Sequence, residues 1–190
     1  MPGHYAGDSR YTVEAYFDLV KDGLLAEDDR VELLDGVIVA EPPMDPQHAA
    51  AIETVAAVLR AAVGDRAAVR SQAPILIAPH SVPEPDIAVV PGQNADYWRR
   101  HPTEALLVVE VAASSLQQDR LSKSRIYASA AVAEYWIVNL RDECLEVFRE
   151  PDPARRVYEA RLLAVRGAQV QLVVFPDISV DVDDLLPPRP

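Results

Sequence analysis

The chain has 190 residues, of which 49% are hydrophobic and 25% are charged, the balance of an ordinary globular protein large enough to bury a core. Its 18 basic and 30 acidic residues give a formal net charge of -12, which argues against a protein that coats nucleic acid but does not exclude a nuclease with a local metal ion. No apolar run approaches the ~20 residues that span a bilayer, and residues 1–10 contain no signal-peptide core. The single Cys144 excludes an internal disulfide and a cysteine-based zinc site. We therefore expect one cytoplasmic domain over residues 1–190.

The first third of the chain predicts two helices and a hairpin. Thr12 caps a helix over residues 12–20, and Gly23 ends it. Residues 31–40, VELLDGVIVA, predict a β-hairpin, because two apolar runs flank Asp35-Gly36, a pair that tolerates the positive φ of a tight turn. After a loop marked by prolines, apolar side chains at helical spacing predict a long helix over residues 47–63 that ends at Gly64.

The remaining chain predicts strands around one further helix. Short strands are expected at 67–70, 74–78 and 87–90, followed by a polar loop over residues 91–104. Residues 106–111, LLVVEV, are almost all apolar, which is typical of a central strand covered on both faces. A helix over residues 115–130 comes next, and then strands at 134–139, 144–149, 156–160 and 170–175. This order predicts one mixed α/β domain.

Glu110 is the strongest single indication of chemistry. Inside LLVVEV its carboxylate would be buried, and burying a lone charge is costly unless the charge is paired or bound to a metal ion. Because side chains alternate along a strand, Glu110 shares a face with Val108 and Ala112. The end of a central strand is where open α/β sheets place their ligands. The alternative, an edge position or an ion pair with an arginine, stays open.

Asp86 and Glu32 are the candidates for a shared metal site with Glu110. Asp86 stands after Pro85 at the entrance of the strand 87–90, where its alternative role is that of a turn or cap aspartate. Paired with Glu110 from an adjacent strand, it forms half of a hard-oxygen site, and Mg²⁺ typically takes one or two such carboxylates. Glu32, on the first strand of the hairpin, is either an exposed strand residue, a third ligand or a base that orients a water.

Lys123 is the candidate cation of the site. It shares one face of the helix over residues 115–130 with Asp119 and Tyr127, since the three are spaced by four. The alternatives are a surface ion pair and an ammonium that reaches the metal site and stabilises an attacking hydroxide or a pentavalent phosphate. His48, at the start of the second helix, is a weaker candidate for a phosphate contact.

The order of these blocks resembles the PD-(D/E)XK nuclease superfamily, and more narrowly the bacterial restriction endonucleases of the Uma family. The blocks cover nearly the whole chain: VELLDGVIV (31–39), PQH (46–48), QAPI (72–75), VPEPDIAVV (82–90), LLVVEVAASS (106–115), DRLSKSRIYA (119–128), VAEYWIVN (132–139) and LEVFR (145–149). The resemblance implies a restriction-endonuclease-like mixed β-sheet flanked by helices, with the acidic residues at one end. The hairpin precedes this sheet, and additional strands follow it.

The resemblance also implies an endonuclease that uses Mg²⁺ or Mn²⁺ to hydrolyse phosphodiester bonds in nucleic acid, above all DNA. The family's metal-binding acids map onto Asp86, Glu110 and Glu32. The superfamily's usual lysine, two residues beyond the strand acid, is Ala112 here, and Lys123 on the following helix is the matching position in the Uma-like branch.

Ala112 and the acidic net charge keep two alternatives open. One is a non-catalytic binding module that retained the nuclease scaffold, and the other is a metal-free hydrolase that uses paired carboxylates as acid and base. Residues 134–139 and 145–149 predict either an apolar surface for a homodimer or strands that fill the core.

Overall fold

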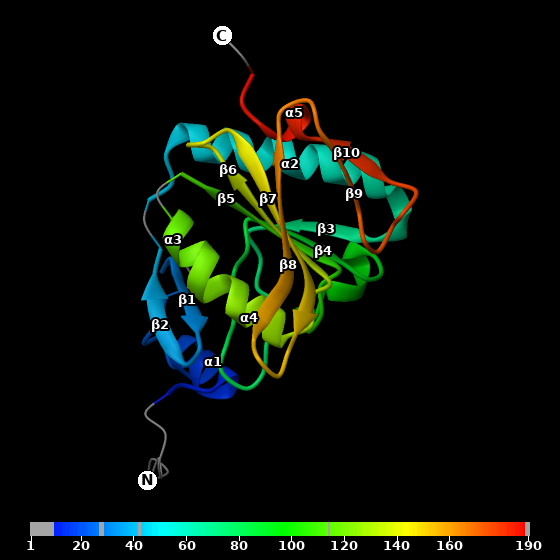
Figure 1. Ribbon diagram of the computed structural model, residues 1–190. Coiled ribbons are helices and arrows are strands. Elements are labelled where there is room, and N and C mark those ends of the chain that lie inside the picture. Colours follow the sequence, from blue (N-terminus) through cyan, green and yellow to red (C-terminus); the bar gives the residue numbers. More distant parts are fainter. Residues whose placement is uncertain (1–9, 27–28, 42, 114, 189–190) are drawn as a thin grey trace.

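The computed structural model describes residues 10–26, 29–41, 43–113 and 115–188, and a six-stranded sheet lies at its centre (Figure 1). The strand order is β3-β4-β5-β6-β7-β8, and only β5 and β6 run parallel, so that the sheet is mixed. The strands are β3 (Ala68–Ser71), β4 (Ile87–Val90), β5 (Leu107–Ala112), β6 (Glu134–Asn139), β7 (Cys144–Asp152) and β8 (Val157–Val165). The mixed α/β architecture predicted from the sequence is confirmed.

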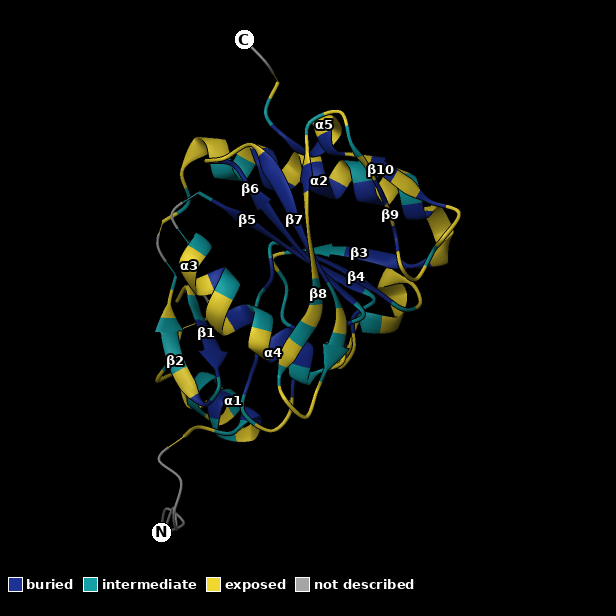
Figure 2. Cartoon of the chain, in the orientation of Figure 1, coloured by how far each residue is buried: buried dark blue, intermediate teal, exposed yellow. Residues whose placement is uncertain are grey.

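The long helix α2 (Pro46–Val63) covers one face of the sheet. Asp45 caps it, because its carboxylate accepts the N–H of His48 at 2.9 Å. The apolar side chains that the sequence predicted along one face of this helix are buried against β5. They also pack against a small C-terminal unit, which consists of the two-stranded sheet of β9 (Gln169–Gln171) and β10 (Ser179–Asp181) and of helix α5 (Val182–Leu185). Figure 2 shows the outer surface of α2 exposed and the inner strands buried.

A second helical segment covers the other face. It consists of α3 (Leu116–Gln118), a π-helical turn η3 (Asp119–Lys123) and α4 (Ser124–Ser129). In the π-helical turn the N–H of Ser124 donates to the carbonyl of Asp119, one residue further than in an α-helix. Val108 and Ala112 of β5 lie in the core beneath this segment, whereas Val109 and Val111 lie in the core beneath α2. Glu110 therefore lies on the face of the second helical segment, as the alternation of side chains predicted.

The N-terminal part places the hairpin beside the entrance of β4. Helix α1 (Val13–Lys21) begins after Thr12, whose hydroxyl accepts the N–H of Ala15 at 3.2 Å. In the hairpin of β1 (Val31–Leu34) and β2 (Val37–Ala40), the turn residues Asp35 and Gly36 have φ of 50° and 82°, which confirms the predicted tight turn. A bridge between Leu33 and Val82 holds β1 next to the segment that leads into Asp86.

Two predicted strands differ from the structure for reasons of backbone pairing. Residues 74–78 form no ladder, because the N–H of Ile75 donates to Pro83 and that of Leu76 to Pro102, in two separate loops. The strand predicted at 170–175 ends at Gln171, since the N–H of Val173 donates to the carboxylate of Glu134 at 3.0 Å instead of to a strand.

Other elements were missed or underestimated in the sequence. β8 pairs with β7 from residue 157 to residue 165, well beyond the predicted end at 160. The short elements η1 (Gly64–Arg66), η2 (Asn94–Tyr97), β10 and α5 were not predicted. In the described ranges, no helix is both long and apolar enough to cross a membrane.

Candidate active site

The four residues singled out in the sequence converge at one pocket beside the end of β5. The pocket has a volume of about 90 Å³. Its wall is built from β1, the loop after β2, the first turns of α2, the entrance of β4, β5 and the start of the α3–α4 segment, and these elements meet on the left of Figure 1. The lining includes Glu32, Asp86, Glu110 and Lys123, together with Arg30, Glu41, Asp45, His48, Ser115, Gln118 and Asp119.

Lys123 joins two of the acids. Its Nζ lies 3.1 Å from Oε1 of Glu110 and 3.2 Å from Oε1 of Glu32, and only 7% of its side chain is exposed. Burial alone would lower the pKa of this ammonium, but the surrounding carboxylates, led by Glu110 and Glu32, raise it above the value of a free lysine. Lys123 is therefore a buried ammonium held between two carboxylates. The alternative of a surface ion pair is wrong.

Glu110 and Glu32 each accept a second hydrogen bond. Tyr127 donates its hydroxyl to Oε1 of Glu110 at 2.8 Å, and the N–H of Glu84 donates to Oε1 of Glu32 at 2.6 Å. Burial raises the pKa of both carboxyls, that of Glu32 to about 7 and that of Glu110 well above its usual range, while the charge of Lys123 opposes the shift. The two acids are thus held in fixed positions in a poorly hydrated environment.

Asp86 is aligned with Glu110 by the backbone of β5. Its Oδ2 accepts the N–H of Val111 at 2.8 Å, and its own N–H lies 3.5 Å from Oε2 of Glu110. His48 completes this side of the pocket, because its Nε2 lies 3.3 Å from each Asp86 carboxylate oxygen. The hydrogen bond to Asp86 raises the pKa of the imidazole, and burial works against it.

Asp119 is a third buried carboxylate of the pocket, after Glu32 and Glu110, and sequence reasoning did not place it there. Ser115 donates its hydroxyl to Oδ2 of Asp119 at 2.7 Å, and burial raises the pKa of this carboxyl to about 6. The main-chain carbonyl of Asp119 accepts both the N–H of Ser124 and the hydroxyl of Tyr135. The four-residue spacing to Lys123 was the sequence signal that could have identified Asp119. His48, which the sequence offered as a weaker candidate for a phosphate contact, lies beside Asp86.

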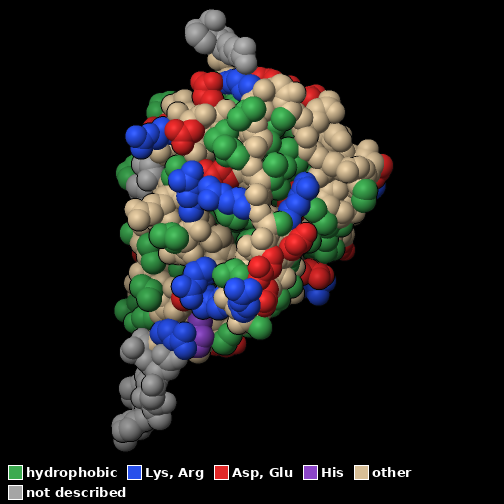
Figure 3. Space-filling model, in the orientation of Figure 1, with side chains coloured by type: hydrophobic (Ala, Val, Ile, Leu, Met, Phe, Trp, Pro, Cys, Tyr) green, Lys and Arg blue, Asp and Glu red, His purple; other side chains and the backbone are tan. Residues whose placement is uncertain are grey.

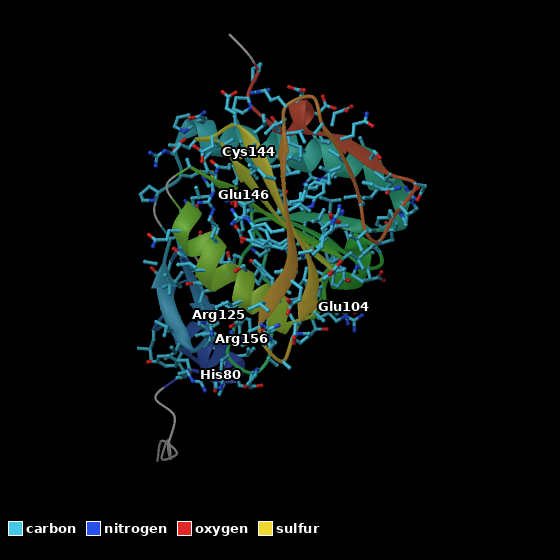
Figure 4. All side chains as sticks on the ribbon, in the orientation of Figure 1. His80, Glu104, Arg125, Cys144, Glu146 and Arg156 are labelled. Carbon is cyan, nitrogen blue, oxygen red and sulfur yellow. The ribbon has the colours of Figure 1, made fainter. Side chains whose placement is uncertain are left out.

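A buried acid two strands away anchors the helix that carries Lys123. Glu146 of β7 lies in the same row of the sheet as Glu110, because Ile137 of β6 pairs with both. Its carboxylate is 0% exposed and accepts hydrogen bonds from Arg120 of the π-helical turn and from Arg161. Figure 4 labels Glu146 on the upper part of β7. The helix is thus fixed to the sheet at two neighbouring charged positions.

The pocket supplies some of the oxygen ligands that a divalent ion requires. Among the described residues, no three His, Cys, Asp or Glu side chains are grouped to hold a metal ion. Oε1 of Glu32 and Oε1 of Glu110 each contact Lys123. Asp86 and Glu110 nevertheless supply hard carboxylate oxygens to one pocket. Since Mg²⁺ takes one or two protein carboxylates and completes its shell with water or phosphate oxygens, the residues present fit such an ion.

Comparisons with known proteins agree with this fold. The model of the Uma2 family, described as "Putative restriction endonuclease", matches residues 13–183. A crystal structure from Anabaena variabilis ATCC 29413, described as "a putative nuclease belonging to DUF820", is similar with a TM-score of 0.71 over 92% of this chain and 97% of that chain. At 16% sequence identity, this likeness shows the fold alone. No curated protein matches the chain. As the series of sequence blocks implied, this chain belongs to the Uma2 family.

Proposed function

We propose that the protein is a metal-dependent endonuclease that hydrolyses phosphodiester bonds in nucleic acid. The observation that carries the proposal is the convergence of Asp86 and Glu110 with a buried, charged Lys123 in one pocket. The description of the Uma2 family supports the same class of reaction.

Asp86 and Glu110 are the residues that would hold Mg²⁺ or Mn²⁺, and Glu32 is the candidate third ligand. When bound, such an ion supplies Lewis-acid polarisation of a phosphate oxygen and lowers the pKa of water. The remaining contribution comes from the protein. The N–H of Val111 orients the Asp86 carboxylate, and the N–H of Glu84 orients that of Glu32.

Lys123 and Glu32 have complementary roles in the proposed reaction. The Lys123 ammonium stabilises negative charge that develops on the phosphate oxygens, and its burial strengthens this interaction because little water screens it. In the alternative in which Glu32 is not a ligand of the ion, its carboxylate accepts a proton from the attacking water. Its pKa of about 7 suits this task, since a general base works best when its pKa lies near the operating pH.

The acidic charge of the pocket makes substrate binding depend on cations. Glu32, Asp86, Glu110 and Asp119 line the same pocket, against Lys123 and the ion-paired Arg30. A phosphate diester entering this pocket meets net negative charge unless a divalent ion is present. We therefore expect binding of nucleic acid, and not only its cleavage, to require Mg²⁺ or Mn²⁺.

Cleavage assays test the proposal directly. Purified protein is incubated with single-stranded and double-stranded DNA and RNA in Mg²⁺, in Mn²⁺ or in EDTA. The comparison is between the wild type, Asp86→Ala and the control Asp18→Ala, which removes an exposed carboxylate from α1. We expect cleavage by the wild type and the control only, and only with a divalent ion. Equal cleavage by the wild type and Asp86→Ala would refute the assignment.

Two observations favour a second candidate, a non-catalytic binding module on the nuclease scaffold. Among the described residues no three-ligand metal group is preformed, and Ala112 replaces the superfamily's usual lysine. Calorimetric titration of the wild type with Mg²⁺ and Mn²⁺ separates the candidates. Binding that is lost in Asp86→Ala supports the endonuclease, whereas the absence of binding by the wild type supports the module.

A further inference from the structure

The contact between His48 and Asp86 has the spacing of two ligands of one ion. Nε2 of His48 lies 3.3 Å from Oδ1 and 3.3 Å from Oδ2 of Asp86. A charge-assisted hydrogen bond from a nitrogen to a carboxylate oxygen measures about 2.7–2.9 Å, so this contact is long, and it favours neither oxygen. Two donor atoms that share an ion through bonds of about 2.1 Å lie roughly 3.0 Å apart in an octahedral shell and about 3.4 Å apart in a tetrahedral one. The observed separation falls between these two values.

Backbone contacts of two separate elements fix these side chains at the pocket. Pro46 opens α2, and the Asp45 carboxylate accepts the N–H of His48 at 2.9 Å, which sets the first turn of the helix. On the side of the sheet, Oδ2 of Asp86 accepts the N–H of Val111 at 2.8 Å. Within the described part of the chain, His48 is the hydrogen-bonding partner found for Oδ1 of Asp86. The imidazole nitrogen and this oxygen are therefore presented to the same pocket from opposite elements.

Glu110 supplies a third donor atom. Its Oε1 is engaged by the ammonium of Lys123 and by the hydroxyl of Tyr127. The contact found for Oε2 is the N–H of Asp86 at 3.5 Å, so Oε2 is the Glu110 oxygen on the side of Asp86. Since no group of three such residues is closed among the residues that the structure describes, the ion completes the set on binding, with water or phosphate oxygens in the remaining positions.

We propose that His48 is a direct nitrogen ligand of the divalent ion, beside Asp86 and Glu110, and that the pocket therefore selects a first-row transition ion such as Mn²⁺ over Mg²⁺. The inference rests on the proposed metal-dependent function and names the class of ion at that site. Mg²⁺ is bound in proteins through oxygen ligands and gives up its water reluctantly. Because transition ions accept imidazole nitrogen as a ligand, one nitrogen in the donor set shifts the preference away from Mg²⁺.

A role of His48 in positioning Asp86 leads to different expectations. If the imidazole only donated a hydrogen bond to Asp86, its loss would weaken the binding of Mg²⁺ and Mn²⁺ alike, because both ions use the same carboxylate. The loss of such an outer contact costs roughly 10–100-fold in metal affinity, so a fall in affinity alone does not separate the two roles. The ratio of the two affinities and the identity of the atoms bonded to the ion separate them.

Calorimetric titration of the purified full chain with Mg²⁺ and with Mn²⁺ measures this ratio. The variant His48→Gln keeps a hydrogen-bond donor but removes the imidazole. His80→Gln is the matched control, because His80 is not part of the pocket lining and its Nδ1 lies 2.9 Å from the carbonyl oxygen of Tyr11. Figure 4 labels His80 at the lower end of the molecule, and Figure 3 shows a histidine side chain on the surface there.

We expect the wild type and His80→Gln to bind Mn²⁺ at least about tenfold more tightly than Mg²⁺, and His48→Gln to lose most of this preference. An unchanged ratio of the two affinities in His48→Gln would overturn the proposal, since that is the behaviour of a positioning residue.

Pulsed electron paramagnetic resonance of the Mn²⁺-loaded protein identifies the atoms bonded to the ion. A coordinated imidazole nitrogen couples to the electron spin of Mn²⁺, and the resulting modulation changes when histidine carries the heavy nitrogen isotope, so the wild type can be tested without a substitution. We expect this modulation in the wild type and in His80→Gln, and its absence in His48→Gln. Mn²⁺ that binds without the modulation, or with a modulation that survives in His48→Gln, would refute the ligand role but leave the proposed endonuclease site intact. A wild type that binds neither ion would refute both.

Discussion

The ion pairs of Lys123 contribute to the free energy of unfolding, so measurements of stability test these contacts without any substrate. Lys123→Met keeps the length of the side chain but removes the charge that Glu32 and Glu110 contact at 3.2 and 3.1 Å. Removing one partner of a buried ion pair costs roughly 3–5 kcal/mol, because an uncompensated charge stays in the interior. The pKa of Glu32 is already about 7, so this carboxyl can take up a proton at neutral pH. We therefore expect a loss near the lower limit, about 3 kcal/mol.

A double-mutant cycle isolates the contact between Lys123 and Glu32. Lys123→Met, Glu32→Gln and the double variant are unfolded in urea at pH 7.5 in EDTA. If the ammonium neutralises Glu32, the double variant is more stable than the sum of the single losses implies, by about 1–2 kcal/mol. The control is Lys21→Met, which changes the exposed lysine of α1 and should alter the free energy of unfolding by less than about 0.5 kcal/mol.

Two results would refute this reasoning. One is a Lys123→Met variant that is as stable as the control. The other is additivity of Lys123→Met and Glu32→Gln within about 0.5 kcal/mol, which is the behaviour of residues that do not touch.

Three further substitutions have defined outcomes. Burial raises the pKa of Glu146, but the hydrogen bonds from Arg120 and Asn139 and the charge of Arg161 outweigh burial, so the pKa is lowered overall. The ionised carboxylate therefore stabilises the folded protein above the pKa of an unfolded glutamate, about 4.3, and this stabilisation is lost as the pH falls through the lower pKa of the folded protein. Urea unfolding between pH 6 and 3 should accordingly show a steeper loss of stability for the wild type than for Glu146→Gln, and parallel curves would contradict this. Tyr127→Phe removes a 2.8 Å hydrogen bond to the buried Glu110 and should cost about 1.5–3 kcal/mol by the same assay; no change would show that the hydroxyl does not serve the carboxylate. Leu59→Ala opens a cavity under α2, where Leu59 is 0% exposed, and should cost about 2–5 kcal/mol in thermal or urea unfolding, whereas a loss below that range would mean the helix does not pack as described.

Glu110 and Asp86 could be predicted as site residues because each departs from what its local sequence would otherwise indicate. Glu110 is a charge in an otherwise apolar strand, and Asp86 stands between a proline and the first residue of β4. Lys123 carried a weaker signal, since a lysine four residues from an aspartate on a helix is usually a surface pair. The burial of Lys123 depends on the packing of its helix over Glu110, which the local sequence does not indicate.

The rest of the site depended on contacts that local sequence does not encode. His48 lies beside Asp86 because α2 begins next to the entrance of β4, 38 residues further along the chain. In the π-helical turn, the main-chain carbonyl of Asp119 accepts a hydrogen bond from the hydroxyl of Tyr135 of β6, 16 residues further along the chain. The missed end of β9 has the same origin, because the Glu134 carboxylate takes the N–H of Val173. These are long-range hydrogen bonds, and neither hydrophobic periodicity nor turn propensity reports them.

The burial of Lys123 also determines the amine chemistry of the chain. Lys21 and Lys123 are its only lysines, against sixteen arginines. Acylating reagents attack neutral, accessible amines, and Lys123 is neither, because its pKa is raised and its side chain is enclosed by carboxylates. A dye or affinity tag with an activated ester would therefore attach to Lys21 on α1, besides the terminal amine, and leave the pocket unmodified. Among its lysines, the protein thus offers one addressable position at which a fluorescent probe can be placed outside the pocket.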